Sequence, residues 1–266
     1  MNRENKIESS LFYEKHLFSF YLKKRILSIS FIGSVILSLI IFFSIVNEFN
    51  SQNIINQKIL DEEIYWQYFI VFLSKYLRFI PVIFVADIVS EEFSNRSAMI
   101  IYTTESRTKI LSIKLLSLMT SILILLLFYF STFLIVNFLK TELFVSISIF
   151  LTGFLIIFIE LLFFSSLIFM ISALTLNVVP SLILPIFYII LELEFFVVFL
   201  EDVELGLLSY SSYEMKVIDF IENLIFNKEI IFSGLTIIST IVFFGLPILI
   251  ILIIFHHFKR IDIRVD

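Results

Sequence analysis

Five charged residues interrupt long apolar stretches of the sequence, where a charge needs a chemical reason. They are Lys75, Arg78, Glu160, Glu192 and Glu194. A charge at membrane depth is costly unless it meets a partner or a water-filled cavity. Three interpretations stay open: a structural ion pair between helices, a polar path or contact for a substrate, and charges that lie beyond the true helix ends.

Helical spacing narrows the possible pairs. Lys75 and Arg78 are three residues apart and share a helix face. Glu192 and Glu194 are about 200° apart around a helix, so they cannot both meet one partner. The hypothesis is that either cation pairs with Glu192 or Glu160. In its sharpest form, a Lys75–Glu192 pair sets the outward-closed state.

Few other residues in the chain could do chemistry. The sequence has no Cys, and its three His are scattered. This excludes disulfides, Cys-ligated zinc, thiol nucleophiles and a His-based metal cage. The five Gly are isolated, so no Gly-rich loop can cradle a phosphate. We therefore expect no catalytic residue, cofactor or metal site in this chain, and any ATP must be bound by another chain.

The composition is that of a membrane protein. Of the 266 residues, 59% are hydrophobic, only 16% are charged and 34 are Phe, and the mean hydropathy is +1.04. A soluble fold must cover its surface with polar groups. These values exclude a soluble enzyme, a nucleic-acid-binding domain and a disordered chain. We expect an all-α integral membrane protein, with residues 1–266 as a single transmembrane domain.

Six stretches are long and apolar enough to cross a bilayer, which takes about 20 residues. Each is apolar all round, unlike an amphipathic helix of a soluble protein. No Ala-x-Ala cleavage site precedes the first, so we expect it to stay in place as an anchor. The predicted spans are residues 26–46, 65–87, 115–136, 143–171, 178–200 and 233–255.

Lysine and arginine predict the orientation, because cytoplasmic loops carry an excess of both. Outside the spans, 13 of them lie on the side of the two termini and 4 lie on the other side. We therefore expect a multi-pass protein of the cell membrane with both termini in the cytoplasm. The inner set is Arg3, Lys6, Lys15, Lys23, Lys24, Arg25, Arg96, Arg107, Lys109, Lys114, Lys259, Arg260 and Arg264, and the outer set is Lys58, Lys140, Lys216 and Lys228.

The most informative loop covers residues 88–114, on the predicted inner side. Ser90 followed by Glu91 and Glu92 is typical of a helix start, because a hydroxyl can cap free amides and carboxylates favour the positive end of the helix dipole. Basic residues near the next span suit an anionic inner leaflet. The loop is either an ordinary juxtamembrane connection or a docking helix for a cytoplasmic partner.

This loop resembles the signature of ABC-2-type transporter permeases, the membrane subunits of a family of ATP-driven exporters. Members commonly have an acidic residue at the end of the second span, then a Glu, a Gly-Thr pair, and a Ser-Arg-x-Lys run that leads to a further Lys. The matching residues are Asp87, Glu91 or Glu92, Ser106-Arg107-Thr108-Lys109 and Lys114. Ser97-Ala98 replaces Gly-Thr and Thr104-Glu105 replaces a usual Pro-hydrophobic pair, without a change of spacing.

The resemblance implies partners. Two permeases, copies or paralogues, would form a dimer, and each would hold a separate ATPase subunit that binds ATP and Mg at the cytoplasmic face. The loop would be the coupling helix. Its candidate coupling residues are Glu91, Glu92, Arg96 and Arg107. The chain itself would be no enzyme, would contact membrane lipids, and would export a hydrophobic or amphipathic substrate such as a lipid, peptide or drug.

Two further segments fit this resemblance. Residues 11–24 place aromatic and aliphatic side chains among charges, like the interfacial elbow helix of the family. The outer segment 201–232 is expected to form a short amphipathic helix or helical pair on the outer surface, with a candidate role as a lid.

Three prolines lie inside predicted spans, where each removes a backbone hydrogen bond and predicts a kink. They are Pro81, Pro185 and Pro247.

Two other functions fit parts of the sequence. Glu91-Glu92-Phe-Ser-Asn-Arg96 matches the Glu-Glu-x-x-x-Arg motif of intramembrane CAAX-type proteases. That chemistry needs later His residues, and only His256 and His257 follow, without an Asn at the right distance. The alternative that stays open is a non-transporting accessory or immunity protein that binds a peptide or lipid. The permease and the accessory protein differ in one testable respect. Only the permease is expected to be required for the membrane association of a cytoplasmic ATPase.

Overall fold

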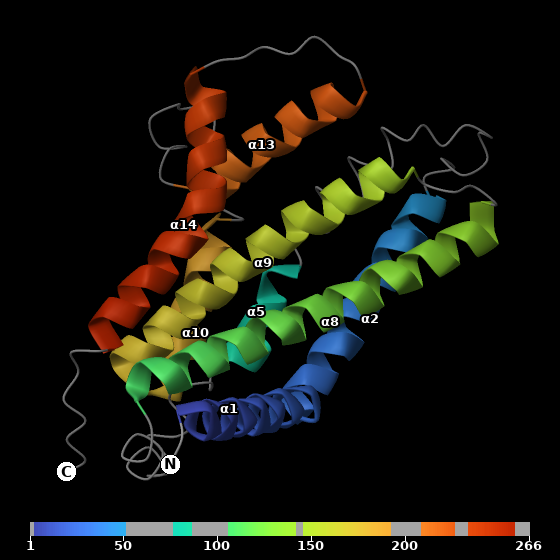
Figure 1. Cartoon of the computed structure of the whole chain (residues 1–266). Helices are drawn as coiled ribbons and strands as arrows, with labels where there is room; N and C mark the ends of the chain where they lie inside the picture. Colours follow the sequence, from blue (N-terminus) through green and yellow to red (C-terminus); the bar gives the residue numbers. More distant parts are fainter. Residues whose placement is uncertain are drawn as a thin grey trace.

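The computed structural model describes residues 3–51, 77–86, 106–141, 146–192, 209–226 and 234–258. Within these ranges the chain forms eight helices and no strand (Figure 1). The expected all-helical class is therefore confirmed for the described part of the chain. The helices are α1 (Arg3–Ile26), α2 (Ile29–Ser51), α5 (Phe79–Val85), α8 (Arg107–Thr141), α9 (Ile147–Thr175), α10 (Val178–Leu191), α13 (Tyr210–Ile225) and α14 (Gly234–Phe258).

Three segments of the described helices are long and apolar enough to cross a membrane. They are Thr108–Thr132 in α8, Ile147–Thr175 in α9 and Gly234–His257 in α14, and they overlap the predicted third, fourth and sixth spans. Helices α2, α5 and α10 overlap the other three predicted spans. The apolar helices support a membrane protein, while the count of six spans stays a prediction.

Large apolar side chains also cover the outward faces of these helices. Leu127 of α8 is 55% exposed, Leu151 of α9 58% and Ile241 of α14 66%. A water-soluble protein of this size rarely exposes contiguous apolar patches beyond a few hundred Å². The inward faces pack into one apolar core to which α5, α8, α9, α13 and α14 contribute. An apolar outer surface around an apolar core suits a lipid environment.

The N-terminal helix α1 packs on the start of α8 (Figure 1). Lys109 Nζ lies 3.2 Å from Glu14 Oε1. The completely buried Lys114 places its Nζ 5.4 Å from the centre of the Tyr21 ring. The chain then turns, and the Ser28 hydroxyl caps α2 by accepting from the Phe31 amide at 3.1 Å. The basic residues before the third predicted span therefore hold the N-terminal helix.

Helix α8 begins earlier than its apolar pattern indicates. The pattern predicts a span from residue 115, whereas the helix begins at Arg107. The reason is that hydrophobicity marks where a helix enters hydrocarbon, while the helix itself continues through the polar region beside it. Residues 107–114 of the predicted coupling loop thus form the first two turns of α8.

The helix ends that were predicted for the inner side gather at one end of the molecule. The first turn of α8, the turn between α9 and α10, and the last turn of α14 lie toward the lower left of Figure 1, and α1 packs on α8 at this end. The α9–α10 turn is short: Leu176 takes a left-handed conformation with φ 51°, and Asn177 Oδ1 caps α10 by accepting from the Val179 amide at 3.0 Å.

Candidate functional site, a buried charge cluster

The guanidinium group of Arg78 lies at the centre of a buried charge cluster, directly before α5. Its Nε donates to Glu160 Oε1 of α9 at 2.5 Å, and its Nη2 donates to Glu214 Oε2 of α13 at 2.5 Å. Its Nη1 donates to Ser211 Oγ at 2.5 Å and to Glu192 Oε2, at the end of α10, at 3.4 Å. Arg78 thereby links segments that are 82 to 136 residues away in sequence.

The cluster is sealed from solvent. Arg78 is 3% exposed, Glu160 and Glu192 are 0% exposed, and Glu214 is 1% exposed. The Arg78 guanidinium also lies 5.5 Å from the centre of the Phe164 ring, an arrangement in which a cation is attracted to the ring face. Because Glu160 lies near the middle of the 29-residue α9, the cluster sits at about half the length of a candidate span.

Glu192 fixes the beginning of α13. Its Oε1 accepts from the backbone amides of Tyr210 at 2.8 Å and Ser211 at 3.3 Å, which are otherwise unpaired amides of a first helical turn. The N-cap residue Ser209 makes no side-chain cap of its own, and its hydroxyl instead donates to Glu192 at 3.2 Å. A carboxylate from α10 therefore replaces the usual local cap and also meets the positive end of the α13 dipole.

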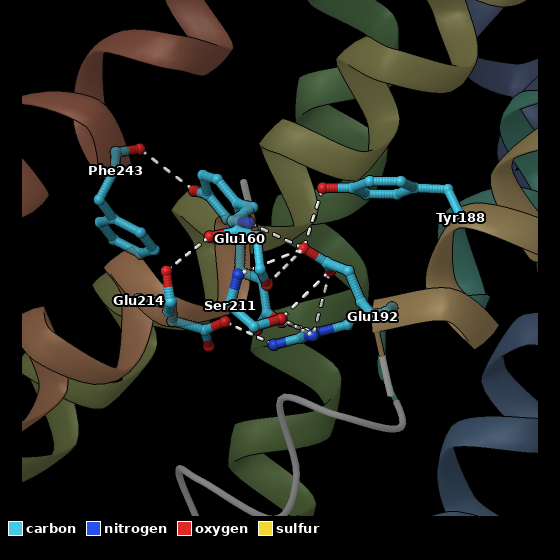
Figure 2. Close-up of polar contacts among 10 residues, drawn as sticks. Glu160, Tyr188, Glu192, Ser211, Glu214 and Phe243 are labelled. Atoms are coloured by element: carbon cyan, nitrogen blue, oxygen red, sulfur yellow. Dashed lines mark hydrogen bonds and ion pairs between the residues drawn. The ribbon is translucent and has the colours of Figure 1, made fainter. Parts of the chain in front are cut away.

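Tyr210, the first residue of α13, is inserted between α9 and α14. Figure 2 shows the polar contacts of this region, with Glu160, Glu192 and Glu214 labelled. The Tyr210 ring stacks on Phe163 of α9, with 3.7 Å between ring centres and 9° between planes. On the other side it stacks on Phe243 of α14 at 5.4 Å. Its hydroxyl donates to the Phe243 carbonyl at 3.1 Å.

Pro247 explains why that carbonyl is available. In a regular helix the Phe243 carbonyl accepts from the amide four residues later, and that residue is Pro247, inside α14. Proline has no backbone N–H, so the carbonyl needs another donor in a buried setting. The hydroxyl of Tyr210 supplies it.

We expect Tyr210→Phe to destabilise the chain by about 1 kcal/mol, because the mutation leaves this buried carbonyl without a donor. In a Pro247→Ala background the same change is expected to cost almost nothing, since the introduced alanine has a backbone N–H that can restore the helical hydrogen bond. Unfolding free energies of the four chains in detergent give the coupling between the two sites. Equal costs of Tyr210→Phe in both backgrounds would contradict the link.

The structure brings together three of the five charged residues that the apolar stretches contain. Arg78 contacts both Glu160 and Glu192. Lys75 and Glu194 lie outside the described residues, so the Lys75–Glu192 hypothesis stays a prediction. Of the candidate coupling residues, Arg107 begins α8. Glu91, Glu92 and Arg96 lie outside the described residues.

The expectation for segment 201–232 placed an amphipathic helix on the outer surface. Helix α13 lies in this segment, but its first turn is buried between α9 and α14. The physical reason is that α13 forms ion pairs and hydrogen bonds with Arg78 and Glu192, which only the fold brings together.

Sequence analysis missed Glu214 for the same reason. A usable signal was present, because Glu214 lies four residues after Tyr210 and four before Ile218, on the otherwise apolar face of the helix.

The cluster can hold helices together and can bind a small positive charge. Within the described residues, no group of three or more His, Cys, Asp or Glu has the geometry of a metal site. Comparison of the chain with models of known protein families and with curated proteins gives no match.

Proposed function

We propose that this chain is the membrane-spanning permease subunit of an ATP-driven transporter of the ABC-2 type. It crosses the cell membrane six times, keeps both termini in the cytoplasm and pairs with a second permease, either a copy or a paralogue. ATP with Mg is bound and hydrolysed by a separate cytoplasmic subunit, and the permease itself has no catalytic site. Its substrate is hydrophobic or amphipathic, in the class of lipids, peptides and drugs.

The observation that carries this proposal is the run from Asp87 to Lys114. It has the spacing of the ABC-2 signature. Its last residues form the first turns of α8, where Lys109 and Lys114 contact α1. A displacement of the loop by a partner would therefore reach α1 and the α8 span together, which is what a coupling element must do.

The charge cluster supports a moving part rather than a passive anchor. It binds the first turn of α13 to three other segments by ion pairs and hydrogen bonds. Such contacts are directional, so they are either formed or broken, and they give a docked helix a defined position. In the proposed transporter, α13 acts as the lid of an apolar path between the spans.

The test is recovery of the ATPase subunit. A tagged chain is purified from native membranes in mild detergent, its partners are identified by mass spectrometry, and vanadate-sensitive ATP hydrolysis is measured. We expect an ATP-binding subunit to copurify with the unmodified chain. With the triple variant Glu91→Gln, Glu92→Gln and Arg107→Gln, we expect the amount of copurified subunit to fall by about tenfold or more, equivalent to about 1.4 kcal/mol of binding free energy.

A matched control makes the same charge changes on the predicted outer side. The variant Asp61→Asn, Glu62→Gln and Lys58→Gln is expected to recover as much ATPase as the unmodified chain. If the subunit is recovered equally with both triple variants, the coupling site lies elsewhere. If no ATPase copurifies with any chain, the transporter proposal fails and the accessory-protein alternative replaces it.

A further inference from the structure

We propose that Glu160 and Glu214 share one proton, which makes the charge cluster a proton-binding site between α9 and α13. This goes beyond the proposed function and does not depend on it, because it concerns a ligand of the chain itself.

The charges of the described cluster do not balance. Arg78 contributes one positive charge, while Glu160, Glu192 and Glu214 can contribute three negative charges within contact of it. The groups are almost completely buried, and uncompensated charge in such an environment is strongly unfavourable. Binding a proton reduces the excess by one charge without further space.

The two oxygens of Glu192 are already occupied by hydrogen-bond donors. Six donor atoms point at its two oxygens, from Tyr188, Ser209, Tyr210, Ser211 and Arg78. An ionised carboxylate is purely an acceptor, so this environment leaves little room for a hydrogen on either oxygen. The proton therefore belongs to the remaining two carboxyl groups, those of Glu160 and Glu214.

Glu160 and Glu214 have the arrangement of two carboxyl groups that share a hydrogen. Each accepts from the same guanidinium group through one oxygen, Glu160 from Nε and Glu214 from Nη2, so the two carboxyl groups meet at one cation. The second oxygen of Glu160, Oε2, is buried and has no donor among the described residues. A proton between the two groups gives a hydrogen bond where two carboxylates would repel each other.

A proton fits this site better than a metal ion. Hard cations such as Ca²⁺ take six to eight oxygen ligands and Mg²⁺ takes six. Here most carboxylate oxygens already accept from Arg78, from hydroxyl groups or from backbone amides. The other groups that face the site are the hydroxyls of Tyr188 and Ser211, while α14 contributes the Phe243 carbonyl, which Tyr210 occupies.

The shared proton links protonation to the position of α13. Glu160 belongs to α9 and Glu214 to α13, so loss of the proton leaves two negative charges facing each other across the contact between these helices. The docked position of α13 then becomes less favourable. With the proton bound, the contact is attractive.

Infrared spectroscopy of the purified full chain in lipid nanodiscs tests the proposal, since a protonated carboxyl group absorbs separately from a carboxylate. We expect a protonated-carboxyl band at neutral pH that disappears when the pH is raised. It is expected to be lost in Glu160→Gln and in Glu214→Gln. It is expected to persist in Glu222→Gln, a control on α13 two turns beyond the cluster.

Thermal unfolding gives an independent readout. The folded state holds one proton more than the unfolded state at neutral pH, so stability must fall as the pH rises through the value at which the folded cluster releases it. We expect the Tm of the unmodified chain to decrease over this range. The Tm of the Glu160→Gln chain is expected to stay constant over the same pH range, because the introduced amide can accept from Arg78 and donate to Glu214 at any pH.

Three results would overturn the proposal. The first is a spectrum of the unmodified chain without a protonated-carboxyl band at neutral pH, which needs no variant to fold. The second is a band that survives both Glu160→Gln and Glu214→Gln. The third is a band that changes when Na⁺ replaces choline at constant pH and ionic strength, because this would assign the site to a metal cation.

Discussion

Replacing Arg78 with Met is expected to remove most of the correctly folded chain from the membrane. The side chain forms ion pairs with buried carboxylates on three other segments. Removal of one partner from a buried ion pair typically costs about 3–5 kcal/mol because the other charge stays unpaired. In this cluster three carboxylates lose their only described cation at once. Size-exclusion chromatography of a fluorescent fusion, together with its Tm, measures the loss.

The matched control is Lys109→Met, which removes a cation from a more exposed pair. Lys109 and Glu14 have side chains that are 24% and 41% exposed, and such pairs contribute about 0–1 kcal/mol. Recovery of Lys109→Met is expected to stay close to that of the unmodified chain. Adding Glu160→Gln to Arg78→Met is expected to restore part of the Tm, because the introduced amide can donate a hydrogen bond to Glu214 in place of the missing guanidinium group. An Arg78→Met chain as stable as the Lys109→Met chain would show that the cluster does not hold the fold together.

The second large effect is expected for Glu192→Ala, which releases the first turn of α13. The mutation removes the acceptor for six donor atoms, two of which are backbone amides of α13. Since each lost buried hydrogen bond costs about 1 kcal/mol and water can compensate only some of them, we expect α13 to undock more often by a factor above about tenfold, or 1.4 kcal/mol.

The sequence makes this undocking easy to measure because it has no Cys. Ile218→Cys introduces a thiol at a buried position of α13, where the native side chain is only 2% exposed. Its rate of modification by a maleimide is expected to rise in the Glu192→Ala chain. Leu224→Cys, at a position that is 54% exposed, is expected to react at the same rate with and without Glu192. Unchanged protection at residue 218 would mean that the aromatic contacts of Tyr210 alone hold α13.

The positions of the described helices were largely predictable from the sequence, because apolar composition reports directly on burial in lipid. Their ends were less so. Helix α9 occupies Ile147–Thr175, four residues later at both ends than the predicted span 143–171. The end of an apolar run does not mark the end of a helix. Helix α9 ends at the left-handed conformation of Leu176, which a leucine at this position does not predict.

The site was predictable only in part, for a different reason. The unusual cost of a charge among apolar residues identified Arg78, Glu160 and Glu192, but this cost says nothing about which pairs form. The third carboxylate, Glu214, belongs to a segment with many polar residues, so its charge did not stand out. The link between Tyr210 and the carbonyl released by Pro247 needs two helices to be placed side by side, which only the tertiary structure provides.

The spacing of the cluster along the chain has a consequence for how the protein is made. Glu160 follows Arg78 by 82 residues, Glu192 by 114 and Glu214 by 136. At a synthesis rate of about 5–20 residues per second, Arg78 precedes its last partner by on the order of ten seconds. During this interval the charge of Arg78 in the second predicted span lacks some or all of its carboxylate partners. The span must therefore insert into the membrane before the charge cluster has formed. Glu214 is the last of the four charged side chains to be made, and its arrival therefore marks the moment at which the charge cluster can become complete, before α14 has been synthesised.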